Sequence, residues 1–328
     1  MKFYESIAAE LMEVEKEIEK MLENEPKEIY GMLFPFIKRG GKRIRPALAI
    51  SCYYAVGGKG KEIIFPAALI EMFHNFTLIH DDIEDDSQFR RGEPTLHRLY
   101  GIPIALNSGD ALYTIIWNKL AYAPLDCRKF RTIERMFSST FKHVVEGQGL
   151  ELDWESSGRF DITEDEYFEM IKKKTAVLIG LSCEIGAMLG GANKKTCTAL
   201  RKFGENIGIA FQIQDDVLNV AGDFSKYQKE IGGDITEGKR TLIVVHSLAH
   251  ATPDEKKRLI TILSSHTSQA EDIKYAIDLF RKYGSIDYAQ QHAYRFVEEA
   301  KKNLECITDE KGKEILTSIA DFVVKRER

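Results

Sequence analysis

Apolar residues along the chain recur mostly at the period of an α-helix. In the segment 11–22 they occupy positions 11, 12, 14, 18, 21 and 22, which form one helical stripe. The segments 66–83, 167–189 and 202–220 have helical length and few turn residues. Strict alternation of apolar and polar residues, which is typical of strands, is rare. The pattern therefore predicts an all-α protein.

Turn-forming residues divide these segments without isolating a separate domain. Gly, Pro, Ser and charged residues concentrate in short stretches at 39–46, 57–61, 86–95, 155–165, 221–239 and 266–270. None of these stretches is a long Gly/Ser linker of the kind that separates domains. We expect one domain over residues 1–328.

Composition narrows the class of protein. Of 328 residues, 44% are hydrophobic and 30% charged, which is a balance that can bury a sizeable core. The net charge of −5 argues against nucleic acid as a partner, and no apolar run of membrane-spanning length occurs. The five cysteines are scattered and have no CxxC spacing. They are typical of reduced thiols, so we expect a cytoplasmic protein without stable membrane insertion.

The stretch LIHDDIEDD concentrates five acidic residues at the end of an apolar segment. At about 100° per residue, Asp81, Asp82 and Asp85 fall within about a quarter of the helix circumference. Like charges at this spacing destabilise a helix unless cations neutralise them. Such hard oxygen ligands suit Mg²⁺, which is commonly shared between carboxylates and substrate phosphates. A second acidic pair, Asp215 and Asp216, repeats the arrangement in FQIQDDVLN.

Basic residues gather in other loops. They comprise Lys42, Arg43 and Arg45 after a Gly pair, Arg90 and Arg91 after the first acidic cluster, Lys172 to Lys174, and Lys229 and Lys239. Guanidinium groups bind phosphate oxygens in pairs, and ammonium groups bind them as point charges. Each motif alone is commonly a solvated surface, and this holds above all for Lys172 and Lys173. Their conjunction favours a metal-bridged diphosphate site.

At this point the sequence resembles the short-chain trans-isoprenyl diphosphate synthases, of the geranylgeranyl or farnesyl type. The matching pieces occur in family order over about 200 residues: GGKRIRP (40–46), HDDIED (80–85), RRGEPT (90–95), GDAL (109–112), GQ (147–148), KTA (174–176), FQIQDDVLN (211–219) and KEIGGDITEGKRT (229–241). The resemblance implies an isoprenoid synthase fold of antiparallel helices around a central apolar cavity, usually in a homodimer. It also implies a prenyltransferase that condenses isopentenyl diphosphate with allylic diphosphates.

The resemblance also implies roles for individual residues. Asp81, Asp82, Asp85, Asp215 and Asp216 would hold about three Mg²⁺ ions with the allylic diphosphate. Residues implied on that diphosphate are Arg90, Lys174, Lys229 and Lys239. Those implied in the isopentenyl diphosphate pocket are Lys42, Arg45, His74 and Arg91. Thr175 and Gln212 would lie near the reacting allylic carbon, with Phe211 close by.

The sequence departs from the family pattern at three positions. Asn219 stands where the second motif usually ends in Asp, so Asp215 and Asp216 are the stronger ligand candidates. Gln228 replaces a glycine before Lys229, and Glu151 stands where the family often has Asp. None of these changes suggests an inactive enzyme.

Product length depends on the floor of the cavity. The resemblance assigns that role to Phe76, five residues before the first Asp, with the smaller Thr77 next to it. This pattern favours geranylgeranyl diphosphate. Phe73, one turn below Phe76, could shorten the cavity and favour some farnesyl diphosphate, or both rings could simply pack the core.

Three other hypotheses compete with a prenyl diphosphate synthase. A terpene cyclase shares the helical scaffold, but the segment from Asp215 does not match its second motif, and it has no use for GGKRIRP. A regulatory subunit of a heteromeric synthase would typically have lost its acidic motifs, and both are present here. A helical interaction protein leaves the paired motifs unexplained.

Overall fold

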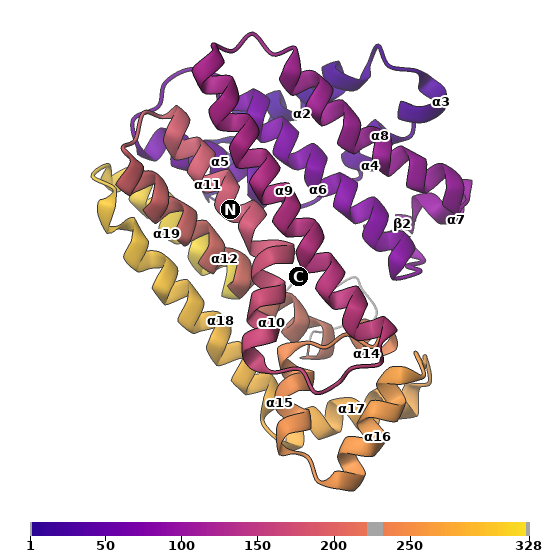
Figure 1. Cartoon of the computed structure of the whole chain (residues 1–328). Helices are drawn as coiled ribbons and strands as arrows, with labels where there is room; N and C mark the ends of the chain where they lie inside the picture. The colour runs from indigo at the N-terminus through magenta and orange to yellow at the C-terminus, as the bar shows by residue number, and fades with distance from the viewer. Residues whose placement is uncertain (1, 222–231, 326–328) are drawn as a thin grey trace. The chain divides into compact units, whose positions relative to one another are not determined.

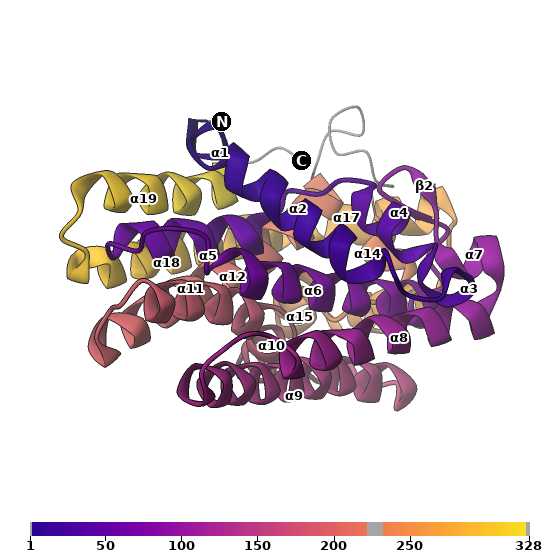
Figure 2. The same ribbon diagram turned by 90° about the horizontal axis from the view of Figure 1, so that it is seen from above.

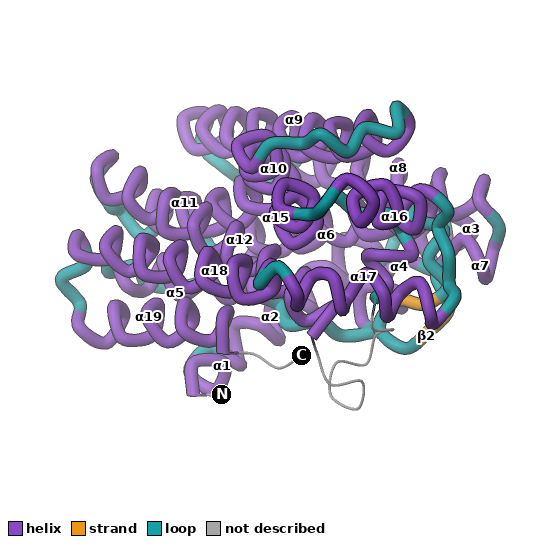
Figure 3. The backbone as a smooth tube through the Cα atoms, turned by 90° about the horizontal axis from the view of Figure 1, so that it is seen from below, coloured by secondary structure: helices purple, strands orange, loops and turns teal. Residues whose placement is uncertain are grey.

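The fold is almost entirely helical in the computed structural model, which describes residues 2–221 and 232–325 (Figure 1). The strands among these residues are β1 (Phe89–Arg90) and β2 (Glu93–Pro94), which pair antiparallel as a small hairpin (orange in Figure 3). The predicted all-α class is therefore confirmed.

The Cα positions group into two compact units. The first comprises Met1–Ser139, Leu181–Arg201 and Cys306–Leu316, and the second Thr140–Gly180, Lys202–Glu305 and Thr317–Arg328. Each unit is described by itself below. The expectation of one domain over 1–328 stays a prediction.

The first unit is organised around α6 (Ile64–Glu84), which packs against α2, α5 and α8 (Figure 2). Its segment from Ile64 to Phe73, which is apolar except for Glu71, is buried almost throughout, and this burial fixes the end that carries the acidic residues. The other elements of this unit are α1 (Lys2–Ser6), α2 (Ala8–Leu22), α3 (Lys27–Tyr30), α4 (Leu33–Lys38), α5 (Ile44–Ala55), α7 (Leu96–Tyr100) and α8 (Ile102–Ala121).

In the second unit α15 packs against α10, α17 and α18. Thr163 begins α10 with a capping box, in which Thr163 and Glu166 satisfy each other's backbone N–H groups. The elements of this unit are α10 (Glu164–Ile171), the π-helical η1 (Lys172–Ala176), α14 (Gly233–Thr236), α15 (Leu242–His250), α16 (Pro253–Ser264), α17 (Ala270–Lys282) and α18 (Ser285–Lys302). Elements with residues in both units are α9 (Cys127–Ser156), α11 (Val177–Leu189), α12 (Lys194–Ala221), η2 (Asn303–Cys306) and α19 (Glu310–Lys325).

The predicted helices 11–22, 66–83 and 202–220 lie within α2, α6 and α12. The segment 167–189 instead crosses α10, η1 and α11, because the helix changes its hydrogen-bond period at Lys172. The predicted break at 39–46 is too long, since α5 already begins at Ile44. Pro46 lies in its first turn, where a missing N–H leaves no helical hydrogen bond unmade.

None of the described helices combines the length and the apolar character that crossing a bilayer requires.

Candidate active site

The first acidic motif lies at the C-terminal end of α6. Asp81 and Asp82 belong to its last turn, and Asp85 is its C-cap residue. Carboxylates at a helix C-terminus face the negative end of the helix dipole, so this placement costs stability. Arg90 of β1 offsets part of that cost, because its Nε and a terminal nitrogen lie 2.7 and 2.5 Å from Asp82 Oδ1. The acidic end and the arginine that follows it in sequence thus form one cluster.

Asp82 is the buried member of this cluster, with 1% of its surface exposed. Burial raises the pKa of Asp82, and the ion pair with Arg90 opposes that shift. Its Oδ2 has no hydrogen-bond partner among the described residues. A buried, unpartnered carboxylate oxygen is costly, so this oxygen is a strong candidate for binding a cation.

A set of cationic side chains surrounds His74 of α6. Burial lowers the pKa of His74 well below its usual value, and Arg45 and Arg91 lower it further, so the ring is neutral. Burial also lowers the pKa of Arg45 and of Arg91 to about 10. Arg45 Nε and Arg91 Nη1 have no acceptor within the described part of the chain. Buried guanidinium nitrogens without an acceptor, beside a neutral imidazole, make this cluster a candidate for binding an anion.

The Gly pair of GGKRIRP lets two segments approach closely. Gly41 has a φ of +128°, and a Cβ there would lie 2.8 Å from a terminal nitrogen of Arg91. Arg43 faces inward, because it donates to Glu71 at 2.7 Å and to the carbonyl of Ile37 at 2.6 Å. Arg43 therefore stabilises the fold, whereas Arg45 keeps donors for a ligand.

Phe76 belongs to an aromatic cluster formed by α6 and α8. Its ring centroid lies 4.7 Å from that of His80, 5.1 Å from Tyr113 and 5.4 Å from Phe73. Phe73 is fully buried, and the Thr77 hydroxyl donates to the carbonyl of His74 at 2.8 Å. The ring of Phe76 thus packs against three other rings, and its role as a cavity floor stays a prediction.

The second acidic motif lies on α12, in the second unit. Asp216 is 5% exposed, and both of its oxygens accept hydrogen bonds, from the Tyr167 hydroxyl and from Gln212 Nε2, each at 3.0 Å. Thr175 of η1 donates to Gln212 Oε1 at 3.1 Å. Burial raises the pKa of Asp216, and the neighbouring Asp215 raises it further. The structure thus joins Thr175, Gln212 and Asp216 in one network.

Asn219 anchors the chain that follows this motif. Its side-chain carbonyl accepts from the Asp234 N–H at 3.1 Å, and its backbone carbonyl accepts from Gly232 at 2.8 Å. Asn219 is 5% exposed, so these contacts are internal. The residue therefore has a backbone-anchoring role that does not require a carboxylate.

The candidate diphosphate lysines of the second unit meet at Glu151. Lys174 donates to Glu151 Oε2, and Lys239 Nζ lies 3.9 Å from the same oxygen. Lys229, the third predicted lysine, lies outside the described residues, as does Gln228. Lys172 and Lys173 form ion pairs with Glu205 and Glu169, which agrees with a solvated helix face.

The helical turn around Lys174 packs closely against glycines of two other helices. A Cβ on Gly147 of α9 would lie 2.2 Å from the backbone nitrogen of Lys174, and one on Gly208 of α12 would lie 2.5 Å from Ala176 Cα. π-Helical turns are rare and occur frequently at functional sites. Here the wider turn places Lys174 and Thr175 against α9 and α12.

This packing makes Gly147 intolerant of a side chain. We expect Gly147→Ala to lower the free energy of unfolding by about 1–3 kcal/mol, because the backbone of η1 cannot yield cheaply. Gly149 on the same helix faces open space, so Gly149→Ala should stabilise by up to about 1 kcal/mol through its helix propensity. Urea unfolding of the two variants measures the difference. Equal effects would contradict the close packing of η1 on α9.

The donor set fits Mg²⁺ that shares its ligands with a substrate. Among the described residues, no group of three or more His, Cys, Asp or Glu side chains could enclose a metal by itself. Mg²⁺ usually takes one or two carboxylates and completes its shell with water and phosphate oxygens. The free Oδ2 of Asp82 matches that demand, whereas a closed structural metal site does not fit.

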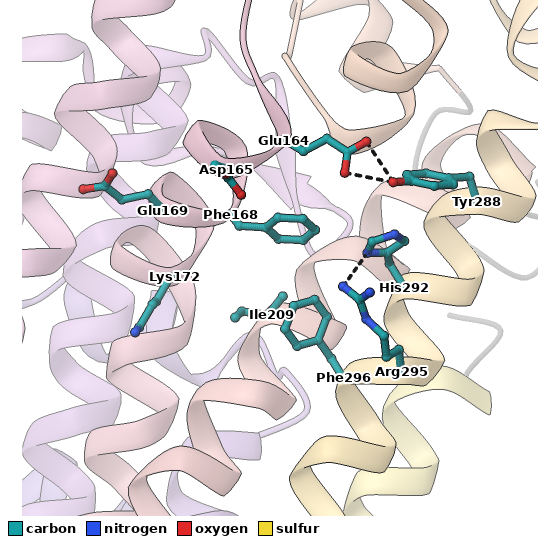
Figure 4. A pocket seen from close by; sticks show the side chains of 10 residues that line it. All are labelled: Glu164, Asp165, Phe168, Glu169, Lys172, Ile209, Tyr288, His292, Arg295 and Phe296. Atoms are coloured by element: carbon teal, nitrogen blue, oxygen red, sulfur yellow. Dashed lines mark hydrogen bonds between the residues drawn. The ribbon is translucent and has the colours of Figure 1, made fainter. Parts of the chain in front are cut away.

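A separate open cavity of about 580 Å³ lies on the second unit (Figure 4). Phe168 of α10 points toward His292 and Phe296 of α18, and the Tyr288 hydroxyl lies 2.8 Å from both oxygens of Glu164. Of the basic motifs, Lys172 lines this cavity, whereas the residues predicted to bind Mg²⁺ or diphosphate do not.

Sequence reasoning missed several residues of these clusters. Tyr167 is 49 positions from Asp216, and Tyr113 is 37 positions from Phe76. In the sequence, Glu151 stands out only as a departure from the family pattern. No local spacing marks these residues, because only the packing of different helices brings them together.

Comparison with known proteins identifies the family. The profile of the polyprenyl synthetase family matches residues 26–280. A short chain isoprenyl diphosphate synthase of Methanothermobacter thermautotrophicus is 41% identical over 291 residues, which cover 89% of this chain and 88% of that protein. The chain belongs to the polyprenyl synthetase family.

Solved structures agree over the whole chain. The geranylgeranyl pyrophosphate synthetase of Pyrococcus horikoshii superposes with a TM-score of 0.92 at 35% identity, covering 99% of this chain and 98% of that one. A polyprenyl synthase of Caulobacter crescentus, crystallised with calcium and isoprenyl diphosphate, gives 0.89 at 26% identity, with coverages of 99% and 97%. The all-helical fold of isoprenyl synthases is thereby confirmed.

Proposed function

We propose that this protein is a trans-prenyltransferase that condenses isopentenyl diphosphate with allylic diphosphates and makes mainly geranylgeranyl diphosphate. The observation that supports the proposal is the cluster of Arg45, Arg91 and neutral His74, in which one buried guanidinium nitrogen of each arginine has no acceptor among the described residues. It provides an anion site beside the first acidic motif, as a two-diphosphate reaction requires. The names of the relatives support this reading.

The two acidic clusters would hold Mg²⁺ on the allylic diphosphate. The proposed ligands are Asp81, Asp82, Asp85, Asp215 and Asp216, with about three ions in all. When bound, Mg²⁺ supplies Lewis-acid activation of the diphosphate leaving group. The Caulobacter protein, which holds calcium and isoprenyl diphosphate, supports a divalent cation here.

The chain's own side chains would carry the remaining steps. Arg90, Lys174, Lys229 and Lys239 neutralise the charge that develops on the leaving diphosphate. Thr175 and Gln212 present oxygen atoms to the allylic cation, and their hydrogen bond fixes both orientations. Lys42, Arg45, His74 and Arg91 hold isopentenyl diphosphate so that its double bond attacks the cation. The proton lost afterwards goes to the released diphosphate.

A substrate-omission experiment tests this reaction. The protein is incubated with Mg²⁺ and farnesyl diphosphate, with or without isopentenyl diphosphate, and released pyrophosphate is measured. The proposal predicts release only when both substrates are present. Release from farnesyl diphosphate alone would indicate a cyclase, and none under either condition would favour a regulatory subunit.

We also propose that the protein is a cytoplasmic homodimer that pairs through an apolar face. Ile102 and Leu106 are four residues apart on α8, Leu99 belongs to the preceding α7, and each of the three exposes 45–54% of its surface. Exposed apolar side chains at this density are typical of interfaces, and a second copy presents the same face in a two-fold arrangement.

Charge on this face should separate the copies. We expect Ile102→Asp with Leu106→Asp to convert a dimer into a monomer, because two carboxylates per copy would be buried against their equivalents. Tyr122→Asp, at an exposed position outside this face, should leave the dimer intact. Light scattering during gel filtration measures the masses. A wild-type protein that is monomeric and active would contradict the proposal.

A further inference from the structure

Glu151 joins the two described lysines that are candidates for binding the allylic diphosphate. Its Oε2 accepts a hydrogen bond from Lys174 and lies 3.9 Å from Lys239 Nζ. All three side chains are withdrawn from solvent, with 14%, 20% and 17% of their surfaces exposed. The lysines come from different parts of the chain, on η1 and after α14, so one carboxylate oxygen links two separate segments.

The charge state of Glu151 suits this position. Burial alone would raise the pKa of Glu151, but Lys174 and Lys239 outweigh burial, and the pKa falls to about 2. A carboxyl group that stays ionised at every physiological pH is poorly suited to general acid–base catalysis, which needs a pKa near the working pH. A permanent negative charge instead suits the holding of two ammonium groups that would otherwise repel each other.

The helix that carries Glu151 contacts Lys174 twice. Gly147 and Glu151 are four residues apart, so they lie on the same face of α9. Gly147 lets the backbone of Lys174 approach, and Glu151 binds its ammonium group. One face of α9 therefore fixes both ends of the same lysine.

We propose that Glu151 is a positioning residue for the allylic diphosphate: it holds Lys174 and Lys239 together so that both ammonium groups face the same ligand. The proposal rests on the assignment of these lysines under the proposed function and adds a residue to it. Glu151 itself does not touch the substrate. Its loss should weaken the site for the allylic diphosphate and leave the site for isopentenyl diphosphate intact.

The chain offers a matched control on the same helix. Glu146 of α9 also pairs with two lysines, Lys142 and Lys173. These pairs are more exposed, since 39% of the Glu146 side chain and 70% of Lys142 are accessible. Neither lysine belongs to the proposed site. Glu146→Gln therefore removes an equivalent charge and its ion pairs without affecting the diphosphate lysines.

Binding of inorganic pyrophosphate with Mg²⁺, measured by calorimetry, tests the proposal directly. We expect Glu151→Gln to weaken pyrophosphate binding about tenfold, which is the usual effect of losing one charge-assisted hydrogen bond. Glu146→Gln should bind like the wild type. Under turnover, the KM for farnesyl diphosphate should rise by a similar factor, while the KM for isopentenyl diphosphate stays unchanged.

Glu151→Asp keeps the charge but shortens the reach, so it should fall between wild type and Glu151→Gln. If Glu151→Gln does not fold, pyrophosphate binding by Glu151→Asp is compared with that of the wild type instead. Unchanged or tighter pyrophosphate binding in a folded Glu151 variant would overturn the proposal, because the carboxylate would then be a bystander or a competitor. If the wild type binds pyrophosphate but does not elongate, the proposed function fails, and the binding comparison still decides the role of Glu151.

Discussion

Replacing Asp81 by alanine is expected to lower kcat by about a thousandfold, because developing charge on the leaving diphosphate would lose a metal ligand. Asp215→Ala should have a similar effect from the other acidic motif. Both residues belong to well-packed helices, so the fold should persist. Steady-state turnover over a range of Mg²⁺ concentrations measures the loss.

Glu84→Ala is the matched control for Asp81→Ala. Glu84 is exposed and ends the same helix, but it is not among the proposed ligands. It should retain turnover within a few fold of wild type. Near-normal turnover in Asp81→Ala or Asp215→Ala, in folded protein, would refute the assignment of that motif. An equal loss in Glu84→Ala would mean that turnover depends on the total negative charge at this helix end and not on specific metal ligands.

Replacing Phe76 by alanine is expected to lengthen the product beyond geranylgeranyl diphosphate. The ring of Phe76 is held by Phe73, Tyr113 and His80, so its removal opens space that its neighbours fill only in part. The growing tail could then extend by further isoprene units. Chromatography of the dephosphorylated products measures the change.

Phe89→Ala serves as the control for Phe76→Ala. Phe89 is 67% exposed and lies outside the aromatic cluster, so its loss should leave product length unchanged. An unaltered product distribution in Phe76→Ala would count against the floor and leave Phe76 as a packing residue. Phe73→Ala then becomes the next test, because Phe73 lies one turn deeper on the same helix.

Local sequence predicted those parts of the protein that depend on neighbours along one helix. The helical span of α6 and the crowding of Asp81, Asp82 and Asp85 follow from residue spacing alone. The start of α5 did not, because a proline in the first turn of a helix resembles a proline in a loop. The basic residues of GGKRIRP, which are separate from the acidic motif, predicted an anion site. The sequence did not predict that Arg43 would instead bind Glu71 within the fold.

Contacts between helices that are far apart in the sequence could not be predicted from local sequence. Tyr167 on Asp216, Glu151 on Lys174 and Tyr113 on Phe76 join different elements. The π-helical turn at Lys172–Ala176 likewise depends on where Gly147 and Gly208 meet it. The spacing of residues along one helix does not indicate which residues of another helix they contact. Tertiary packing determines these contacts, and several of them orient the candidate catalytic groups.

Measuring product length from three allylic starters is the decisive experiment on the proposed prenyltransferase activity. Purified protein is incubated with isopentenyl diphosphate, Mg²⁺ and, separately, dimethylallyl, geranyl or farnesyl diphosphate, and the dephosphorylated products are separated by chromatography. We expect geranylgeraniol from all three starters and no product when Mg²⁺ is chelated. A stop at farnesol from the shorter starters would keep the synthase and make Phe73 the limit. No elongation by folded protein in the presence of Mg²⁺ would show that the protein is not a prenyl diphosphate synthase.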